Sequence, residues 1–557
     1  MIKKIPAVKW MSEYKSENLS SDILAGIIVA IMLIPQGMAY AMLAGLPPEI
    51  GLYSSTIPLI IYALFGSSRH LAIGPVAMVS LLVAEGISGI ATSGSSEYIK
   101  YALILALMVG VIQFLLGIFK LGFIVNFLSH AVISGFTSAA ALIIGLSQLK
   151  HLLGIDLGRG KTVFHLIYEA IMRINEVNII ALLIGIISIA ILYFVKKKFP
   201  KFPTPLIVVM GSILIVKGFN LNELGVSIVG DIPKGLPSFS FHELNFDVFS
   251  TLFPIALVIS FVSFMESIAV AKALAAKDRY NVDSNKELIG LGLANIVGSF
   301  FSSYPVTGGF SRSAVNYQSN AKTGLASIIT ALIIIVTLIF FTGLFYYLPN
   351  AVLASIIMVS VFGLIDIKEA KYLFKVKKAD GWTLVITFIS TLVLGIERGI
   401  LVGVGVSLLI FIWERAYPHI AELGYLEEEG VFRDVAKHPN AKTYKEGVIL
   451  RVDASLYFAN MKFLEDKLCN IIGENKEIKW FILDFSGVNK IDGVSIHSLE
   501  GILGNCKNKE VEFYLSGIKG SVMDMMKRAK LDQRLGNKIK YLTINHALKK
   551  IEPYASK

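Results

Sequence analysis

Two apolar stretches of the chain, residues 71–84 and 303–315, break at a proline and then resume with a short helical pattern. They read LAIGPVAMVSLLVA and SYPVTGGFSRSAV, and neither holds the roughly 20 uninterrupted apolar residues that cross a bilayer as one helix. Both lie inside a long hydrophobic region, where an exposed broken backbone is costly. Paired broken segments in two halves of a membrane protein mark the binding site of many transporters. If both helices begin near mid-membrane, their N-terminal N–H groups point into one cavity and favour an anion there.

The chain divides into two parts that suit different solvents. Charged residues make up 17% of its 557 residues, whereas soluble proteins are typically about a quarter charged. Charged residues are scarce in the part of the chain before residue 421, where apolar runs dominate. We therefore expect a cytosolic N-terminal segment at 1–21, a transmembrane domain at 22–420, a linker at 421–442 and a soluble domain at 443–557.

The net charge of +11 does not indicate a nucleic-acid partner, because the basic residues gather in short loops between apolar stretches. Arg69, Lys120 and Lys322 fall on the same side as the basic N-terminus. The positive-inside rule places that side, together with the C-terminal domain, in the cytoplasm. We expect a multi-pass protein of the cytoplasmic (inner) membrane, in contact with lipid. Cys469 and Cys506 suggest neither a disulfide framework nor a metal site, and we expect no cofactor.

Apolar runs separated by glycine, proline and charge predict about fourteen membrane elements. They span 22–44, 51–66, 75–91, 98–119, 123–148, 178–195, 203–219, 250–276, 287–301, 308–318, 324–347, 350–365, 381–396 and 399–415. Beyond residue 443 the pattern changes to strands at 447–454, 478–488 and 510–517. Helical patterns follow them at 460–472, 493–505 and 519–530. This alternation is typical of a small α/β domain.

An internal repeat is indicated by the spacing of four residues. Pro75 and Pro305 are 230 positions apart (305 − 75), and the same offset separates Gln36 from Glu266 (266 − 36). Each half thus has a polar residue inside a helix, followed by a proline-broken helix. An odd number of helices in each half inverts the second copy and creates a pseudo-two-fold axis in the membrane plane. The alternative is coincidence among many prolines and glycines.

The first apolar helix carries three residues that suit a cavity wall. Pro35 removes a backbone donor and frees a carbonyl upstream, and Gln36 can both donate and accept hydrogen bonds. Tyr40 lies four residues after Gln36 and therefore shares its helix face. This face either lines the cavity, or Gln36 bonds to a neighbouring helix while Tyr40 only packs.

The second broken segment supplies a positive charge next to flexible backbone. Gly309 has no side chain to block close approach of a ligand, Phe310 follows it, and Ser311 can donate a hydroxyl. Arg312 lies about one turn inside the helix, and an intramembrane arginine is a functional hypothesis by default. The alternative is a structural ion pair between Arg312 and Glu266.

The remaining candidates are apolar or acidic. Val76 and Ala77 occupy the matching first turn of the other broken segment, where they offer apolar walls and backbone N–H groups. Glu266 lies in the otherwise apolar run LVISFVSFMESIAVAKALA, so it either couples transport to a cation or is the fixed counter-charge of Arg312. One turn later Val270 supplies no oxygen, which speaks against a sodium site.

Four motifs closely resemble the SulP anion transporters, also called the solute carrier 26 group. They are PQGMAYAMLAGLPPEIGLYSS, IGPVAMVSLL, KELIGLGLANIVGSFF and PVTGGFSRSAVN. The resemblance covers nearly the whole chain, including a tail that resembles a STAS domain. It implies an all-α membrane domain of seven plus seven helices in inverted repeats, with core and gate subdomains, two half-helices and an elevator-like movement. It also implies a homodimer and a small cytosolic α/β STAS domain.

The resemblance assigns roles to individual positions. The family's anion site is matched by Gln36, Tyr40, Val76, Phe310, Ser311 and Arg312. Glu266 matches the acidic position that members use for coupling. In the bicarbonate–sodium branch of the family, the resemblance places an aspartate at this acidic position and a threonine one turn later. This chain has Glu266 and Val270 instead, which favours coupling to protons or anion exchange over coupling to sodium. In the tail, Gly493 follows Asp492 where STAS domains often carry a phosphorylatable residue, so we expect dimer contacts or a cytosolic protein partner instead.

These observations favour a secondary transporter of an inorganic oxyanion, with sulfate as the first choice, driven by proton symport or anion exchange. Bicarbonate, chloride or a dicarboxylate remain open as substrates. An anion channel on the same fold and a sensor that signals through the tail are the alternatives. No nucleophile–base pair or metal cluster indicates an enzyme.

Overall fold

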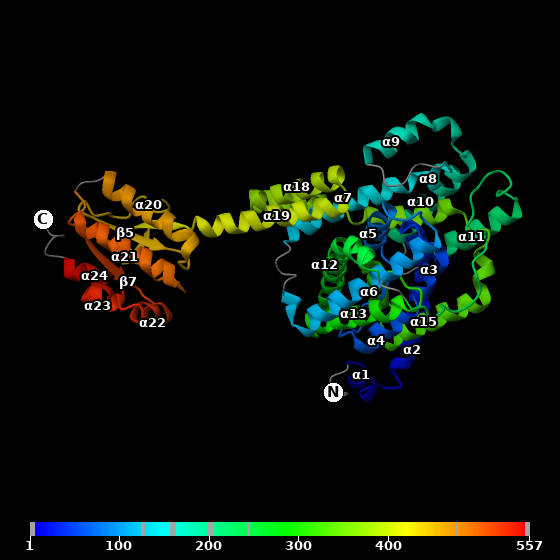
Figure 1. Ribbon diagram of the computed structural model, residues 1–557, viewed down its shortest axis with the longest axis horizontal. Coiled ribbons are helices and arrows are strands. Elements are labelled where there is room, and N and C mark those ends of the chain that lie inside the picture. The colour runs from blue at the N-terminus through cyan, green and yellow to red at the C-terminus, as the bar shows by residue number, and fades with distance from the viewer. Residues whose placement is uncertain are drawn as a thin grey trace. The chain divides into compact units, whose positions relative to one another are not determined.

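A computed structural model describes residues 6–123, 129–155, 163–198, 204–241, 245–474 and 477–551. The chain forms two compact units, Met1–Ser407 and Leu408–Lys557, each with its own core (Figure 1). Parts of three expected segments, residues 124–128 of helix 123–148, residue 203 of helix 203–219 and residues 1–5 of the N-terminal segment, lie outside the described residues.

The first unit is almost entirely helical. Its helices are α1 (Pro6–Ser12), α2 (Asn18–Leu43), α3 (Pro48–Tyr53), α4 (Ile57–Phe65), α5 (Ala77–Ser88), α6 (Ser96–Ile118), α7 (His130–Ser147), α8 (Leu149–Leu153), α9 (Val163–Met172), α10 (Ile179–Lys198), α11 (Thr204–Gly218), α12 (Phe246–Lys277), α13 (Ser284–Ser299), α14 (Phe310–Gln318), α15 (Leu325–Val336), α16 (Asn350–Phe362), α17 (Ile367–Val376), α18 (Lys378–Leu394) and the first half of α19 (Ile396–Ala416), which continues past Ser407 into the second unit. Each of the expected apolar stretches contains a helix. Eight helical spans among the described residues, several of which join consecutive helices such as α3 and α4, are long and apolar enough to cross a membrane by length and composition.

Two expected helices are interrupted in the structure. The stretch 51–66 is divided between α3 and α4, with Ser54, Ser55 and Thr56 between them. The hydroxyls of all three bond to carbonyls three or four residues upstream, which competes with a continuous helix. The stretch 324–347 passes from α15 into a π-turn at Thr337–Phe341 and a 3₁₀ turn at Thr342–Phe345.

The packing of the helices repeats in the two halves of the first unit. Near the 230-residue offset, α2 corresponds to α12, α4 to α13, α5 to α14 and α6 to α15. Helix α2 of the first half packs on α14 and α15 of the second half. Its counterpart α12 packs on α5 and α6, which are the first-half counterparts of α14 and α15. In the same way α13 packs on α6, and α4 packs on α15. This reciprocal pattern is what an internal repeat with interlocked halves produces.

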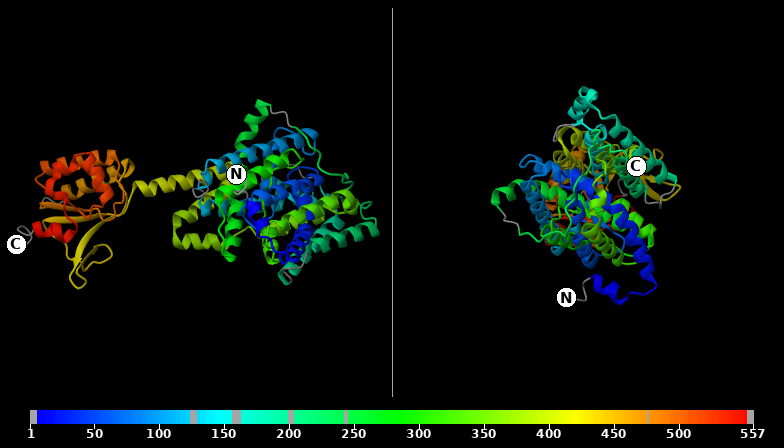
Figure 2. Two further views of the ribbon diagram at one scale, coloured as in Figure 1. Left: turned by 90° about the horizontal axis from the view of Figure 1, so that it is seen from below. Right: turned by 90° about the vertical axis from the view of Figure 1, so that its right-hand side faces the viewer.

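The second unit is the expected α/β domain. Its five-stranded sheet has the order β4-β3-β5-β6-β7, with β5 (Gly447–Val452), β6 (Trp480–Asp484) and β7 (Glu512–Ser516) parallel (Figure 2). Its helices are α20 (Phe458–Glu474), α21 (Gly493–Asn508), α22 (Gly520–Arg528), α23 (Leu531–Leu535) and α24 (Ile544–Ile551). Asp492 caps α21 by accepting from the Ser495 N–H at 2.7 Å.

The segment expected as a linker, 421–442, contains two strands of this sheet. Strand β3 (Ile420–Leu426) pairs antiparallel with both β5 and β4 (Val431–Asp434). The charged turn Glu427–Gly430 between them gives the segment a polar composition, but Ile420, Ala421 and Leu423 are buried. An antiparallel hairpin at the edge of a sheet mixes polar and buried apolar residues in this way, because one of its faces meets solvent.

Candidate functional site

The two broken segments meet directly, although they are more than 230 residues apart in sequence. Strand β1 (Ile73–Gly74) pairs antiparallel with β2 (Thr307–Gly308), with Ile73 opposite Gly308 and Gly74 opposite Thr307. The Gly309 N–H extends this ladder by donating to the Ala72 carbonyl at 3.2 Å. The extended pair satisfies backbone groups that the broken helices leave behind, which is the condition for such backbone at membrane depth.

Helices α5 and α14 begin immediately after this strand pair. Their N-caps, Val76 and Gly309, have extended backbones, and no side chain caps either first turn. The first intrahelical bonds run from the Ser80 N–H to the Val76 carbonyl and from the Ser313 N–H to the Gly309 carbonyl. The N–H groups ahead of these bonds are the donors that a helix leaves free at its start. They give each start a partial positive charge.

Arg312 joins the two segments. Its side chain is buried, with 2% of its surface exposed. The guanidinium donates to three backbone carbonyls, those of Ala72 at 2.8 Å, Pro75 at 2.7 Å and Thr307 at 3.0 Å. These acceptors are uncharged, so the positive charge of Arg312 stays next to the two helix starts. A single residue therefore holds the crossing and supplies charge to it.

A polar network beneath the crossing supports it. The Ser267 hydroxyl on α12 accepts from the Gly308 N–H at 2.8 Å and bonds to the Thr307 hydroxyl at 2.7 Å. The Asn295 side chain on α13 accepts from the Val306 N–H at 2.8 Å and donates to the Val306 carbonyl at 3.1 Å. None of these supporting residues was among the sequence candidates. Their signal is a polar side chain inside an apolar helix, which is too common to single them out.

All of the predicted site residues line one cavity of about 430 Å³. They are Gln36, Tyr40, Val76, Ala77, Glu266, Gly309, Phe310, Ser311 and Arg312. The other walls come from α10, α11 and α16 and are mainly aliphatic, with the hydroxyls of Thr204 and Ser360 among them. The cavity thus has a positive, N–H-rich side and an apolar side.

Glu266 makes no ion pair with Arg312 within 4.0 Å, and its Oε2 is buried without a hydrogen-bond partner in the described part of the chain. Two other buried acids differ. Glu287 accepts from the Tyr62 hydroxyl at 2.6 Å and from Ser67 at 2.7 Å. Asp22 accepts from the Lys322 N–H at 2.6 Å. Glu266 is therefore not in a direct ion pair with Arg312 in the structure, although the two charges are close enough to attract each other.

Gln36 makes no hydrogen bond to a neighbouring helix among the residues that the structure describes, so the structural alternative for its amide is not observed either. Only 4% of the Gln36 surface is exposed, and the residue borders the cavity on the face that it shares with Tyr40. Its amide is therefore available to a ligand in the cavity.

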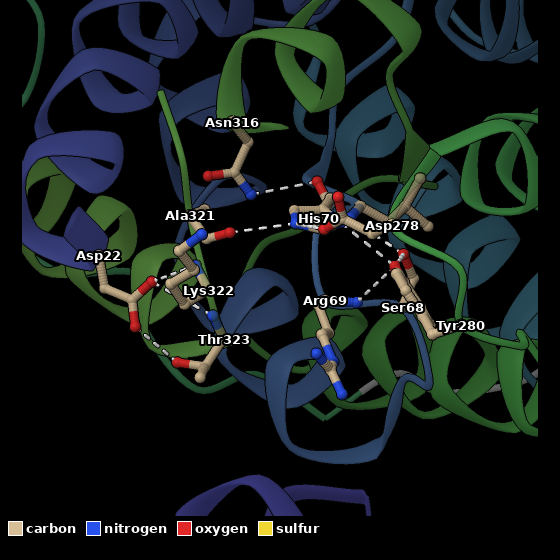
Figure 3. A network of polar contacts seen from close by, with 11 residues as sticks. Asp22, Ser68, Arg69, His70, Asp278, Tyr280, Asn316, Ala321, Lys322 and Thr323 are labelled. Atoms are coloured by element: carbon tan, nitrogen blue, oxygen red, sulfur yellow. Dashed lines mark hydrogen bonds and ion pairs between the residues drawn. The ribbon is translucent and has the colours of Figure 1, made fainter. Parts of the chain in front are cut away.

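The far end of α14 is held by a second network, drawn in Figure 3. His70, two residues before Ala72, bonds through Nε2 to the Ala321 carbonyl at 3.0 Å, and its own carbonyl accepts from the Asn316 side chain at 3.1 Å. Burial lowers the pKa of His70, although Asp278, whose Oδ2 lies 3.4 Å from Nε2, acts in the opposite direction. Both ends of α14 are thereby fixed to the stretch from His70 to Pro75.

The sequence profile of the sulfate permease family matches residues 19–387. The chain belongs to this family. A STAS domain profile matches residues 438–546, which confirms the resemblance of the tail. Together the two matches confirm the expected membrane domain with a C-terminal STAS domain.

Relatives of this sulfate permease family member extend over nearly its whole length. Sulfate transporter 4.1, chloroplastic, from Arabidopsis thaliana is 42% identical over 98% of this chain and 82% of its own length. Probable sulfate transporter 4.2 from the same plant is 41% identical over 99% of this chain and 84% of its own length.

Solved structures share the fold. The murine solute carrier 26 family member A9 anion transporter, in its inward-facing state, superposes with a TM-score of 0.92 at 25% identity, over 99% of this chain and 94% of that one. The transmembrane domain of a cyanobacterial bicarbonate transporter, BicA, gives a TM-score of 0.62 at 24% identity, over 71% of this chain and 98% of that one. The multi-pass membrane fold is thus established for this family member.

Proposed function

We propose that this protein is a secondary active transporter of an inorganic oxyanion, with sulfate as its substrate. The observation that carries the proposal is the convergence of two uncapped helix starts and Arg312 on one cavity. Curated relatives named as sulfate transporters, at 42% and 41% identity, support sulfate over other anions.

The binding step follows from the donors at the cavity. A bound oxyanion accepts from the first-turn N–H groups of α5 and α14 and from the Ser311 hydroxyl, which take the place of its water shell. Donors that are already oriented lose little entropy when they bind an anion, and a helix start favours negative charge. Arg312 contributes a positive field while its own donors stay on backbone carbonyls. The Gln36 amide and the Phe310 ring complete the wall of this site.

The transport step follows from the two sides of the cavity. Its positive side is carried by α2, α5, α12 and α14, which pack on one another. Its aliphatic side is carried by α10, α11 and α16. A dianion gains little from aliphatic contacts, so the second side can slide past the bound anion at low cost. We infer an elevator-like movement of the first helix group against the second, with alternating access to the cavity.

Glu266 is the proposed coupling residue. A buried carboxylate with an unpartnered oxygen is costly when charged, so proton uptake with each anion relieves that cost. This favours proton symport, with anion exchange as the other mode. We also propose a homodimer in the cytoplasmic membrane, with the N-terminus and the STAS domain in the cytosol and the STAS domain making dimer contacts or binding a cytosolic protein.

The test is uptake into proteoliposomes that contain the purified protein and a panel of labelled anions: sulfate, bicarbonate, chloride and a dicarboxylate. Imposed pH and sodium gradients are applied separately. We expect sulfate to accumulate above its external concentration when the pH gradient is present, without a sodium requirement. Dissipative flux that never exceeds equilibrium would indicate a channel and overturn the proposal. Accumulation of another anion in preference to sulfate would overturn the substrate assignment.

A further inference from the structure

Helix α17 presents an unusual surface between two membrane helices. It follows α16 after four residues and is separated from α18 by Lys377, and none of its residues is buried. Lys368, Lys371 and Lys375 are exposed on it. At about 100° per residue these three lysines lie within a band of about 60° on the helix surface. They therefore form one continuous basic strip, called here the lysine strip.

Exposed apolar side chains border the lysine strip on both sides. Ile367 lies on one flank and is 64% exposed, while Tyr372 and Val376 lie on the other and are 60% and 64% exposed. Large apolar side chains exposed beside a basic strip are typical of helices that lie in the headgroup region of a membrane. The same borders are unfavourable for a helix surrounded by water.

The opposite side of α17 fixes it to the membrane domain. The helix packs on α7 and α18, and the Phe374 ring meets the Trp382 ring edge to face at a centroid distance of 5.8 Å. The acidic groups nearby are used on this side: Asp366 caps the helix, and Glu369 lies 3.5 Å from His130. The helix is thus anchored with its lysine strip outward.

The lysines of the strip have no acidic partner in the part of the chain that the structure describes, in contrast to Lys377, which pairs with Asp380 at 3.8 Å. We propose that the lysine strip binds the headgroup phosphate of an anionic phospholipid, with the acyl chains lying along the apolar borders. This one ligand matches both the charge of the strip and the apolar flanks. A soluble phosphate matches the charge alone.

Trp382 provides a built-in probe, because it touches α17 and is 57% exposed. The full-length protein is placed in phosphatidylcholine vesicles that contain a small fraction of dansyl-labelled phosphatidylglycerol or dansyl-labelled phosphatidylcholine. Energy transfer is measured from tryptophan to the dansyl group. The part of it that is lost in the Trp382→Phe variant is the signal from this site. We expect that signal to be at least twofold larger for the glycerol lipid, and to fall to the phosphatidylcholine level in the triple variant K368Q/K371Q/K375Q.

A matched control removes the same charge elsewhere. The variant K527Q/K549Q/K550Q changes three exposed lysines of the second unit and should keep the full preference for phosphatidylglycerol. Equal transfer from both lipids in the wild type would overturn the proposal. A preference that survives in K368Q/K371Q/K375Q would also overturn it. If the triple variant instead changes the oligomeric state in light scattering while lipid transfer stays unchanged, the strip meets a second copy of the chain, and the lipid assignment is wrong.

Discussion

The substitution Gly309→Ala isolates the position of Arg312 without removing its charge. A Cβ at residue 309 would lie 2.8 Å from Cζ of Arg312 and 2.9 Å from its Nε. Ordinary carbon contacts are about 3.5–4.0 Å, so the guanidinium has to move by about 0.7 Å. The guanidinium is not a free end, because it donates to three carbonyls at 2.7, 2.8 and 3.0 Å.

The magnitude follows from those hydrogen bonds. A shift of this size breaks at least one of them, and a hydrogen bond to a charged group contributes about 1.5–3 kcal/mol. We therefore expect the free energy of unfolding to fall by about 1.5–3 kcal/mol. Because the same displacement moves charge away from the helix starts, we expect the apparent affinity for sulfate to fall about tenfold, which corresponds to about 1.4 kcal/mol.

The assay combines thermal unfolding with concentration-dependent sulfate uptake in proteoliposomes. Gly211→Ala on α11 is the matched control, because a Cβ there meets no atom within 4 Å. We expect this control to keep wild-type uptake and to be at least as stable as the wild type, because alanine favours a helix over glycine. Wild-type unfolding and wild-type uptake in Gly309→Ala would refute the reasoning that the Arg312 position matters.

Three further predictions address other parts of the protein. Glu266→Gln should keep sulfate exchange but lose the stimulation of uptake by a pH gradient, and an unchanged pH dependence of uptake would remove Glu266 from coupling. Burial lowers the pKa of His70 in the folded protein below its ordinary value of 6.5, so the unfolded chain binds the proton more readily and the free energy of unfolding falls as the pH drops through 6.5. The variant His70→Gln should therefore lose less thermal stability between about pH 7.5 and about pH 5.5 than the wild type; equal losses would contradict this. Truncation after Tyr417 removes the whole sheet of the second unit, whereas truncation after Lys442 keeps β3 and β4 but removes β5, with which β3 pairs. The longer product should therefore aggregate more in size-exclusion chromatography. Equal monodispersity of the two products would count against the role of β3.

The broken segments could be predicted from sequence because proline leaves a clear local signal. Pro75 and Pro305 interrupt apolar runs that are otherwise long enough to be helices. The 230-residue offset could then relate Gln36 to Glu266. What joins the two segments could not be predicted, because the bond between Arg312 and the Ala72 carbonyl spans 240 residues. No local sequence pattern predicts a contact between residues that are so far apart in the chain.

The sequence also could not predict which of the buried acidic side chains have hydrogen-bond partners. In the folded chain Asp22 and Glu287 are buried and Glu266 has a buried carboxylate oxygen, and the local sequence patterns do not show which of the three accepts hydrogen bonds. The structure shows that Asp22 and Glu287 accept several hydrogen bonds, while Glu266 keeps an unpartnered oxygen beside the cavity. This difference depends on the loops that fold over each carboxylate. Such long-range packing decides whether an acid is structural or available.

The central claim is that the starts of α5 and α14 jointly hold the transported anion. The most direct measurement is an anomalous difference map from crystals grown with selenate, a heavier analogue of sulfate. The account predicts one strong peak in the cavity, with selenate oxygens within about 3 Å of first-turn nitrogens of both helices. A peak against one helix alone, or a peak outside the cavity in protein that still transports sulfate, would contradict it.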